Sequence, residues 1–301
     1  MQAIKAENIS KIFGQVKAVD HISFHVDSGE IVGLIGPNGA GKTTTIRMIL
    51  DIFKPDSGSI SVLGGPMDES KKDLIGYLPE ERGLYQDITL EQCLTFLASL
   101  KGMEMGLIKE KLEIYLDSFD LLDYRKKKLK ELSKGLQQKA QLITAFIHQP
   151  KLVIVDEPFS ALDPVNTQMA KDIFREERAN GTAIIMSTHQ MNQAEELCDR
   201  ILLVNKGQIV LEGRLENIRA QFAKREILVK TSGSLPQKIR GVSIIEPVNE
   251  HYRLYLGETS SANEVLADLV NHGVHLESFE IEQPTLDEIF IQTVTGRGNN
   301  Q

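Results

Sequence analysis

Paired cysteines, long apolar runs and excess positive charge are all missing from this chain of 301 residues. Its two cysteines, Cys93 and Cys198, are far apart and form no metal-binding pattern, so we expect reduced thiols of the kind found in cytosolic proteins. No stretch reaches the roughly 18 apolar residues that a membrane-spanning helix needs, and the N-terminus has no apolar signal core. We therefore expect a chain that is soluble by itself and that acts at a membrane only through a partner.

The charge balance argues against a general nucleic-acid binder. Lysine and arginine number 34 and aspartate and glutamate number 42, which gives a net charge of −8. The basic run at residues 125–130 (RKKKLK) is short, and a solvated helix face explains it better than a nucleic-acid site. No internal repeat and no sustained heptad pattern is found. The length favours two globular domains over one.

The most informative segment, GPNGAGKT at residues 36–43, matches the pattern G-x-x-x-x-G-K-[ST]. The apolar run Ile31–Ile35 before it predicts a strand, and apolar residues at helical spacing after it predict a helix that ends at Lys54–Gly58. A strand, a glycine loop and a helix start form a phosphate cradle, because the loop N–H groups and the positive helix end face one anion. Lys42 would reach the β- and γ-phosphates, and the Thr43 hydroxyl would ligate Mg²⁺. The predicted nucleotide-binding residues of this segment are Gly36, Pro37, Asn38, Gly39, Ala40, Gly41, Lys42, Thr43 and Thr44.

The remaining pattern predicts an α/β fold. Short strands are expected in residues 1–30 and at Ser59–Leu63, whereas residues from about 87 to 150 show helical periodicity and predict a helical insert. The continuous apolar runs Leu152–Val155 and Ala183–Met186 predict strands that are buried on both faces. The alternation of strands and helices implies a parallel sheet with helices on both faces.

From about Glu226 the sequence changes character. Three strands, a helix, a fourth strand and a last helix are expected between residues 226 and 295. We therefore predict two domains, residues 1–220 and residues 226–295, of which the second is a small α/β accessory unit. Residues 296–301 are expected to be disordered.

Acidic and imidazole side chains follow two of the predicted parallel strands. Asp156 and Glu157 end one run, and His189 follows the other. Because open α/β sheets bind ligands at the carboxyl ends of their strands, these residues are expected beside the phosphate cradle. Asp156 would hold Mg²⁺ directly or through water, Glu157 would polarise the water that attacks the γ-phosphate, and His189 would donate a hydrogen bond to that phosphate. The alternative interpretation of Asp156 and Glu157 is a solvent-exposed acidic turn. The phosphate loop upstream makes this interpretation the weaker of the two.

The segment Leu132–Gln138 precedes another helix with apolar periodicity. Ser133 is its predicted N-cap, and Gly135 would let a phosphate approach the backbone. By itself this segment predicts only a capped helix.

In combination these segments resemble one family, the ATP-binding cassettes of ABC transporters. The matching segments are residues 36–43 with the Walker A motif, 152–157 with Walker B and its catalytic glutamate, 133–137 with the signature, 160–163 with the D-loop, and His189 with the switch histidine. Phe13 lies where the family has an aromatic residue that stacks on adenine, and Asp163 falls in the D-loop. The resemblance implies a P-loop NTPase fold with a RecA-like parallel sheet core, an antiparallel β subdomain, a helical signature subdomain and the small C-terminal domain.

Two departures from the family pattern stand out. The signature carries Lys134 and Leu136, where the usual form is Ser-Gly-Gly-Gln. At the Q-loop position Glu80 replaces the glutamine that contacts Mg²⁺ in the family, and its carboxylate can still accept the bonds of a metal. The lysine-bearing signature and the C-terminal segment at residues 284–290 resemble the subset that serves export of sodium, drugs or antibiotics.

The resemblance also implies cofactors and partners. ATP and Mg²⁺ would bind between the Walker A motif of one cassette and the signature of a second one, which we expect to be an identical chain. The helical insert would transmit the motion to an integral membrane permease. The chain is then expected at the cytoplasmic face of the membrane, without nucleic acid.

Two other functions share the phosphate loop. A soluble cassette ATPase acting on ribosomes or DNA would carry two cassettes or long coiled-coil insertions, and neither is found here. A small-molecule kinase would leave the signature, the D-loop and His189 unexplained together. An ATPase subunit of an exporter is therefore the leading hypothesis.

Overall fold

The computed structural model describes residues 1–81, 83–223, 225–257 and 259–295, so the disorder predicted at residues 296–301 lies outside the described residues. The described chain divides into two compact units, Met1–Leu215 together with residues 293–295, and Glu216–Gln292. The first of these borders lies slightly before the predicted one at residues 220–226. Independent folding of the two parts stays a prediction.

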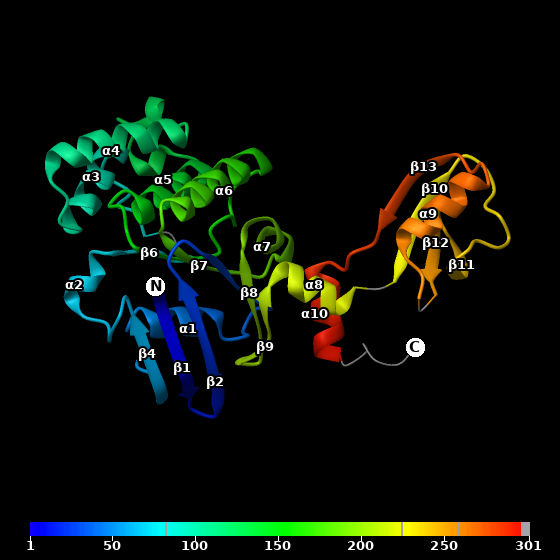
Figure 1. Ribbon diagram of the computed structural model, residues 1–301. Coiled ribbons are helices and arrows are strands. Elements are labelled where there is room, and N and C mark those ends of the chain that lie inside the picture. The colour runs from blue at the N-terminus through cyan, green and yellow to red at the C-terminus, as the bar shows by residue number, and fades with distance from the viewer. Residues whose placement is uncertain (82, 224, 258, 296–301) are drawn as a thin grey trace. The chain divides into compact units, whose positions relative to one another are not determined.

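The first unit is built around a six-stranded sheet with the strand order β5-β6-β7-β3-β8-β9 (Figure 1). Its strands are β3 (Ile31–Ile35), β5 (Ile75–Leu78), β6 (Leu152–Asp156), β7 (Ala183–Thr188), β8 (Arg200–Asn205) and β9 (Gln208–Arg214). The pairings among β5, β6, β7, β3 and β8 are parallel, and β9 joins the edge antiparallel. Every residue of β3, β6 and β7 is buried, as their continuous apolar runs predicted.

The first unit also contains the helices of the insert and the helices that connect successive strands. They are α2 (Glu69–Lys72), α3 (Leu90–Leu100), α4 (Met105–Ser118), the 3₁₀ turns η1 (Leu122–Tyr124) and η2 (Leu129–Glu131), α5 (Lys134–Phe146), α6 (Pro164–Ala179) and α7 (Met191–Leu197). The predicted helical insert is confirmed by α3, α4 and α5. Among the described residues, no helix combines the length and the apolar character needed to cross a bilayer.

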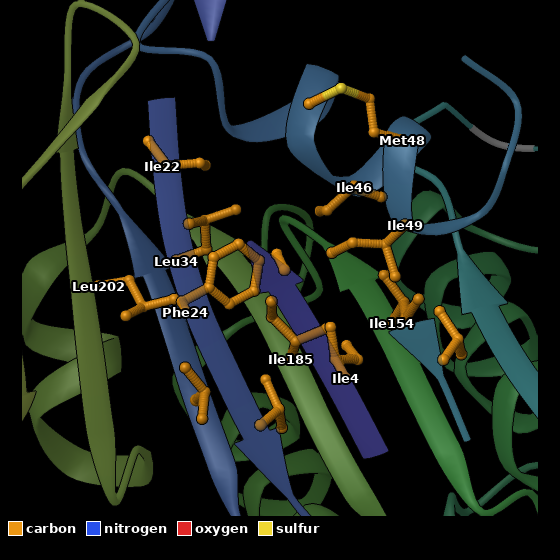
Figure 2. Packing of buried hydrophobic residues seen from close by; sticks show 14 of the residues in the cluster. Ile4, Ile22, Phe24, Leu34, Ile46, Met48, Ile49, Ile154, Ile185 and Leu202 are labelled. Carbon is orange, nitrogen blue, oxygen red and sulfur yellow. The ribbon is translucent and has the colours of Figure 1, made fainter. Parts of the chain in front are cut away.

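The opposite face of the sheet is covered by one helix and by the antiparallel β subdomain that the family resemblance implied. It packs against α1 (Lys42–Ile49) and a three-stranded antiparallel sheet, β2-β1-β4, with strands at Gln2–Phe13 (β1), Val16–Asp27 (β2) and Ser57–Val62 (β4). Figure 2 shows Phe24 and Ile4 of this small sheet beside Ile46 of α1 and Ile185 of β7. The expectation of helices on both faces was therefore only partly right, because a β-sheet shares one face with α1.

Two local predictions also need correction. β1 and β2 are long, with 12 residues each, because their mutual pairing continues through several register shifts instead of ending at short strands. Helix α1 ends at Ile49 and not at Lys54, because Asp51 takes a left-handed backbone conformation with φ of 60°.

The second unit holds a four-stranded antiparallel sheet in the order β11-β12-β10-β13. Its elements are α8 (Leu215–Phe222), β10 (Glu226–Thr231), β11 (Val242–Val248), β12 (His251–Leu256), α9 (Ala262–Asn271), β13 (Leu276–Ile281) and α10 (Leu286–Thr295). Val265 and Leu269 of α9 share a small apolar core with Ile227, Val229 and Leu254 of the sheet. The predicted order of strands and helices after Glu226 is confirmed, whereas α8 was not predicted.

Candidate functional site

The candidate site lies where the carboxyl ends of four neighbouring parallel strands meet. Strands β5, β6, β7 and β3 are adjacent in the sheet, and their ends are in register: Leu78 pairs with Val155, Asp156 with Ser187, and Ile35 with Thr188. The segments that follow these strands therefore start from one edge, which is the ligand-binding edge of an open α/β sheet.

The loop between β3 and α1 requires glycine at two positions. Gly36 has φ of 149°, and a Cβ on it would lie 2.1 Å from the carbonyl oxygen of Val204. Gly41 has φ of 109°, and a Cβ there would lie 2.3 Å from the carbonyl oxygen of Ala18. Any side chain at these positions would displace neighbouring backbone. The loop can thus curve tightly and deliver the chain to the N-terminus of α1.

Lys42, the first residue of α1, is held inside this loop. Its Nζ donates to the carbonyl oxygens of Gly36 at 2.7 Å and Pro37 at 3.1 Å. Burial lowers the pKa of the Lys42 ammonium, and the carboxylates of Glu157, Asp156 and Glu80 oppose that shift. A buried cation facing three carboxylates can bind an anion there together with a metal ion.

Asp156 joins the strand end to the glycine loop. Its Oδ2 accepts a hydrogen bond from Thr43 Oγ1 at 3.0 Å, and its Oδ1 accepts one from Ser187 Oγ. The side chain is buried, with only 2% of the residue exposed. One carboxylate and one hydroxyl oxygen side by side are ligands that Mg²⁺ accepts in proteins.

Glu157 is held firmly in a strained conformation. Its φ is 50°, in the left-handed region, and its N–H donates to the carbonyl oxygen of Ser187 at 3.0 Å. Its carboxylate accepts from Thr188 Oγ1 at 3.1 Å and from the His189 N–H at 2.8 Å, and its Oε1 lies 2.7 Å from His189 Nδ1. The side chain of Glu157 is 9% exposed and that of His189 48% exposed. The carboxylate is therefore fixed while the imidazole edge remains open to solvent.

A cleft of about 550 Å³ gathers most of the predicted residues. The predicted residues that line it are Asn38, Gly39, Ala40, Gly41, Lys42, Thr43, Thr44, Glu80, Asp156 and Glu157. Gly36 and Pro37 belong to the same loop and bind Lys42 through their carbonyls. His189 lies beside the cleft through its contact with Glu157.

Four predicted residues lie apart from this cleft. Phe13 packs edge-on against Phe53, with ring centroids 5.4 Å apart, and is 44% exposed. Ser133 caps α5 and Asp163 caps α6, each accepting a backbone N–H two or three residues into its helix. Gly135 lies beside the D-loop, because a Cβ on it would be 3.4 Å from the carbonyl oxygen of Ala161. Signature and D-loop thus form a second group, separate from the cleft lining.

Sequence analysis missed several residues of the site. The hydroxyls of Ser187 and Thr188 orient Asp156 and Glu157, and their position at the end of a strand before His189 was the available signal. Residues 16–18 and Lys206 also line the cleft. They lie at the start of β2 and in the β8–β9 turn, and no motif marks them.

Comparison with known proteins gives the following similarities. The family model described as "ABC transporter" matches residues 19–160, and that of the C-terminal domain of DrrA1-3-like ATP-binding proteins matches residues 213–294. An uncharacterized ABC transporter ATP-binding protein of Bacillus subtilis (strain 168), YhaQ, is 39% identical over 290 residues, which cover 96% of this chain and 97% of that protein. The Nod factor export ATP-binding protein I of Rhizobium sp. (strain N33) is 32% identical, over 98% of this chain and 97% of that protein.

A solved structure agrees with these relatives. It is that of an ATP-binding subunit of an ABC transporter, which superposes with a TM-score of 0.69 and 34% sequence identity. The match covers 73% of this chain and 93% of the solved one.

Proposed function

The chain belongs to the ATP-binding proteins of ABC transporters, which are ATPases, and from that premise we propose that it powers an exporter built with a membrane permease. The observation that supports the export direction is that a relative aligning over nearly the whole chain is named for Nod factor export. The relatives give no support to a cassette that acts on ribosomes or DNA. In this proposal the chain lies at the cytoplasmic face of the membrane.

The donor groups in the cleft fit ATP and Mg²⁺. The loop of residues 36–41 leads into the N-terminus of α1, and Lys42 adds a buried cation where phosphates would lie. Thr43, Asp156 and Glu80 supply hard oxygen ligands, and Mg²⁺ takes few protein ligands when phosphate and water oxygens complete its shell. When bound, Mg²⁺ would neutralise charge on the phosphates.

The observation that carries the catalytic proposal is the geometry of Glu157. Its carboxylate lines the cleft at the end of β6, and three hydrogen-bonding groups of residues 188–189 hold it in place. A fixed carboxylate at this position would orient and polarise the attacking water. His189 would bridge Glu157 and the γ-phosphate, because its ring contacts Glu157 on one side and is half exposed on the other.

An exposed apolar patch supports docking to the permease. Tyr85 and Phe96 are 52% and 43% exposed and form an edge-on pair with centroids 5.6 Å apart. Leu100, one helical turn after Phe96 on α3, is 61% exposed. Tyr85 belongs to the same connection between β5 and α3 as Glu80, so a partner bound at this patch would contact the connection that carries Glu80. We assign this patch to the permease.

A second, identical cassette completes the proposed unit. Ser133 and Gly135 lie outside the cleft of their own chain, at the N-terminus of α5. A helix N-terminus attracts anions. In a dimer these residues would face the ATP that is bound to the partner's glycine loop.

The substitution Glu157→Gln tests the proposed function. The isosteric amide preserves packing but cannot polarise water, so we expect ATP affinity within about twofold of the wild type and turnover lower by about 10²- to 10⁴-fold. With Mg-ATP the variant should elute as a dimer in size-exclusion chromatography. Glu176→Gln, an exposed carboxylate on α6, is the matched control and should keep full turnover. Turnover that is unchanged in Glu157→Gln would remove Glu157 from catalysis.

A further inference from the structure

Helix α5, which begins after Ser133, contacts the two loops of the nucleotide site that follow β5 and β6. At its C-terminal end it lies directly on β5, because a Cβ on Gly76 would fall 1.9 Å from the carbonyl oxygen of Ala145. At its N-terminal end Gly135 lies beside Ala161 of the D-loop. Between these two contacts, two buried glutamine side chains face the loops after β5 and β6.

Gln138 binds the loop after Glu157. Its Nε2 donates to the carbonyl oxygen of Pro158 at 2.9 Å, and the residue is only 4% exposed. This is a hydrogen bond of normal length. It fixes the backbone that follows the proposed catalytic carboxylate onto α5.

Gln141, one turn later, binds the loop that carries Glu80. Its Nε2 donates to the carbonyl oxygens of Glu81 at 3.3 Å and Pro79 at 3.5 Å, so a single amide group holds the residues on both sides of Glu80. Gln141 is 3% exposed, and its Oε1 is buried with no hydrogen-bond partner among the residues that the structure describes. These bonds are long, and a lone buried acceptor costs free energy. The contact is therefore incomplete in this conformation.

We propose that Gln141 is a positioning residue that sets Glu80 in the nucleotide cleft and couples it to the helix beginning at Ser133. This inference rests on the proposed role of Glu80 as a metal ligand. Because the amide holds both neighbours of Glu80, a shift of α5 along or away from β5 moves the Glu80 carboxylate relative to Lys42 and Asp156. Residues that orient metal ligands typically change metal affinity or activity by about 10- to 100-fold when they are substituted.

The variant Gln141→Met separates positioning from folding. Methionine has a similar length and volume, lacks the donor, and also removes the unpartnered buried oxygen, so the fold should be retained. Tyr115→Phe is the matched control. Tyr115 is also buried, and its hydroxyl joins α4 to Glu177 of α6 and to the carbonyl oxygen of Phe146, away from Glu80.

Two measurements test the coupling on the full chain. The first is ATP binding by titration calorimetry, with chelator and over a range of Mg²⁺ concentrations. The second is amide hydrogen exchange of the peptide that contains residues 75–81. For Gln141→Met we expect unchanged ATP affinity in chelator, a half-saturating Mg²⁺ concentration raised about tenfold, and faster exchange of that peptide. Tyr115→Phe should change neither quantity.

A double-mutant cycle with Glu80→Ala distinguishes the inference from its premise, because alanine leaves no oxygen that could bind the metal. If Gln141 acts through Glu80, Gln141→Met should add almost nothing to the Mg²⁺ dependence of Glu80→Ala. Additive effects, or a Gln141→Met chain with wild-type Mg²⁺ dependence, would overturn the inference while the role of Glu80 stands. A Glu80→Ala chain with wild-type Mg²⁺ dependence would overturn the metal-ligand role itself, and with it the positioning role.

Discussion

The sheets of the two units bury their strands in different ways. In the first unit β3, β6 and β7 are buried along their whole length between α-helices on one face and α1 with the small β-sheet on the other. In the second unit α9 shares a core with one face of the sheet, and the alternate residues Lys230 and Arg253 carry charge on the other face. Lys230 pairs with Glu250 at 3.0 Å, and Arg253 lies 3.3 Å from Glu226.

This difference explains why the predicted catalytic and nucleotide-binding residues lie in the first unit. Parallel strands that are buried on both faces end together at one edge of the sheet. The polar residues that follow them therefore lie close to one another and are shielded from water. Lys42 and Asp156 are buried in this way, so their electrostatic interactions are strong. The Lys230–Glu250 pair, in which the Glu250 side chain is 78% exposed, lies in a high dielectric and contributes little. None of the predicted catalytic or nucleotide-binding residues lies in the second unit.

Removing the buried cation should have the largest effect. Lys42→Ala takes away a point charge and its hydrogen bonds to phosphate, which are worth about 1.5–3 kcal/mol each. ATP affinity should therefore fall by about a hundredfold or more, as measured by nucleotide titration. Lys54→Ala is the control, because the Lys54 side chain is 78% exposed and pairs with Asp51 at the surface. Wild-type affinity in Lys42→Ala would show that the interpretation of the glycine loop is wrong.

A partly buried histidine offers a further test of how burial affects charge in the first unit. His148 follows α5, and burial together with Lys101 lowers its pKa from 6.5 to about 4, whereas Asp73 opposes the shift. The folded state thus favours the neutral ring, so its stability is complete above about pH 6.5 and is lost as the pH falls towards about 4. The loss amounts to about 3 kcal/mol at the acid end.

The substitution His148→Leu isolates this effect. The variant should lose less stability than the wild type between pH 7 and pH 4 in thermal unfolding followed by circular dichroism, because carboxylate titration is common to both chains. Parallel losses in the two chains would mean that His148 does not carry the acid sensitivity.

Sequence patterns predicted the parts of the site that depend on local chemistry. The glycine loop, the apolar runs of β3, β6 and β7, and the N-cap Ser133 each follow from a short stretch of sequence. The roles assigned to the individual site residues stay predictions.

What the sequence did not predict depends on long-range packing. The hydrogen bonds of Ser187 and Thr188 depend on the register between β6 and β7, and those of Gln138 and Gln141 depend on how α5 lies on β5. The residue patterns alone did not show that a β-sheet covers one face of the parallel sheet, since the pairing of β1 with β4 joins segments far apart in the sequence; only the family resemblance implied an antiparallel β subdomain.

The smallest expected effect on nucleotide binding comes from deleting the second unit. A chain that ends after Ala223 keeps every proposed catalytic and nucleotide-binding residue, and the two units have separate apolar cores. ATP affinity should stay within about twofold of the wild type, because distant sites without shared partners contribute independently. Dimerisation with Mg-ATP or basal turnover should change, since we propose that the second unit regulates the cassette or strengthens its dimer.

Three measurements decide the outcome of this truncation: nucleotide titration, size-exclusion chromatography of the Glu157→Gln background with Mg-ATP, and steady-state turnover. An insoluble chain, or one that no longer binds ATP, would show that the two units depend on one core and do not fold separately. Unchanged dimerisation and turnover would leave the second unit without the proposed regulatory role. A soluble chain with normal ATP affinity and weaker dimerisation would place all the chemistry in the parallel-sheet unit and assembly in the antiparallel one.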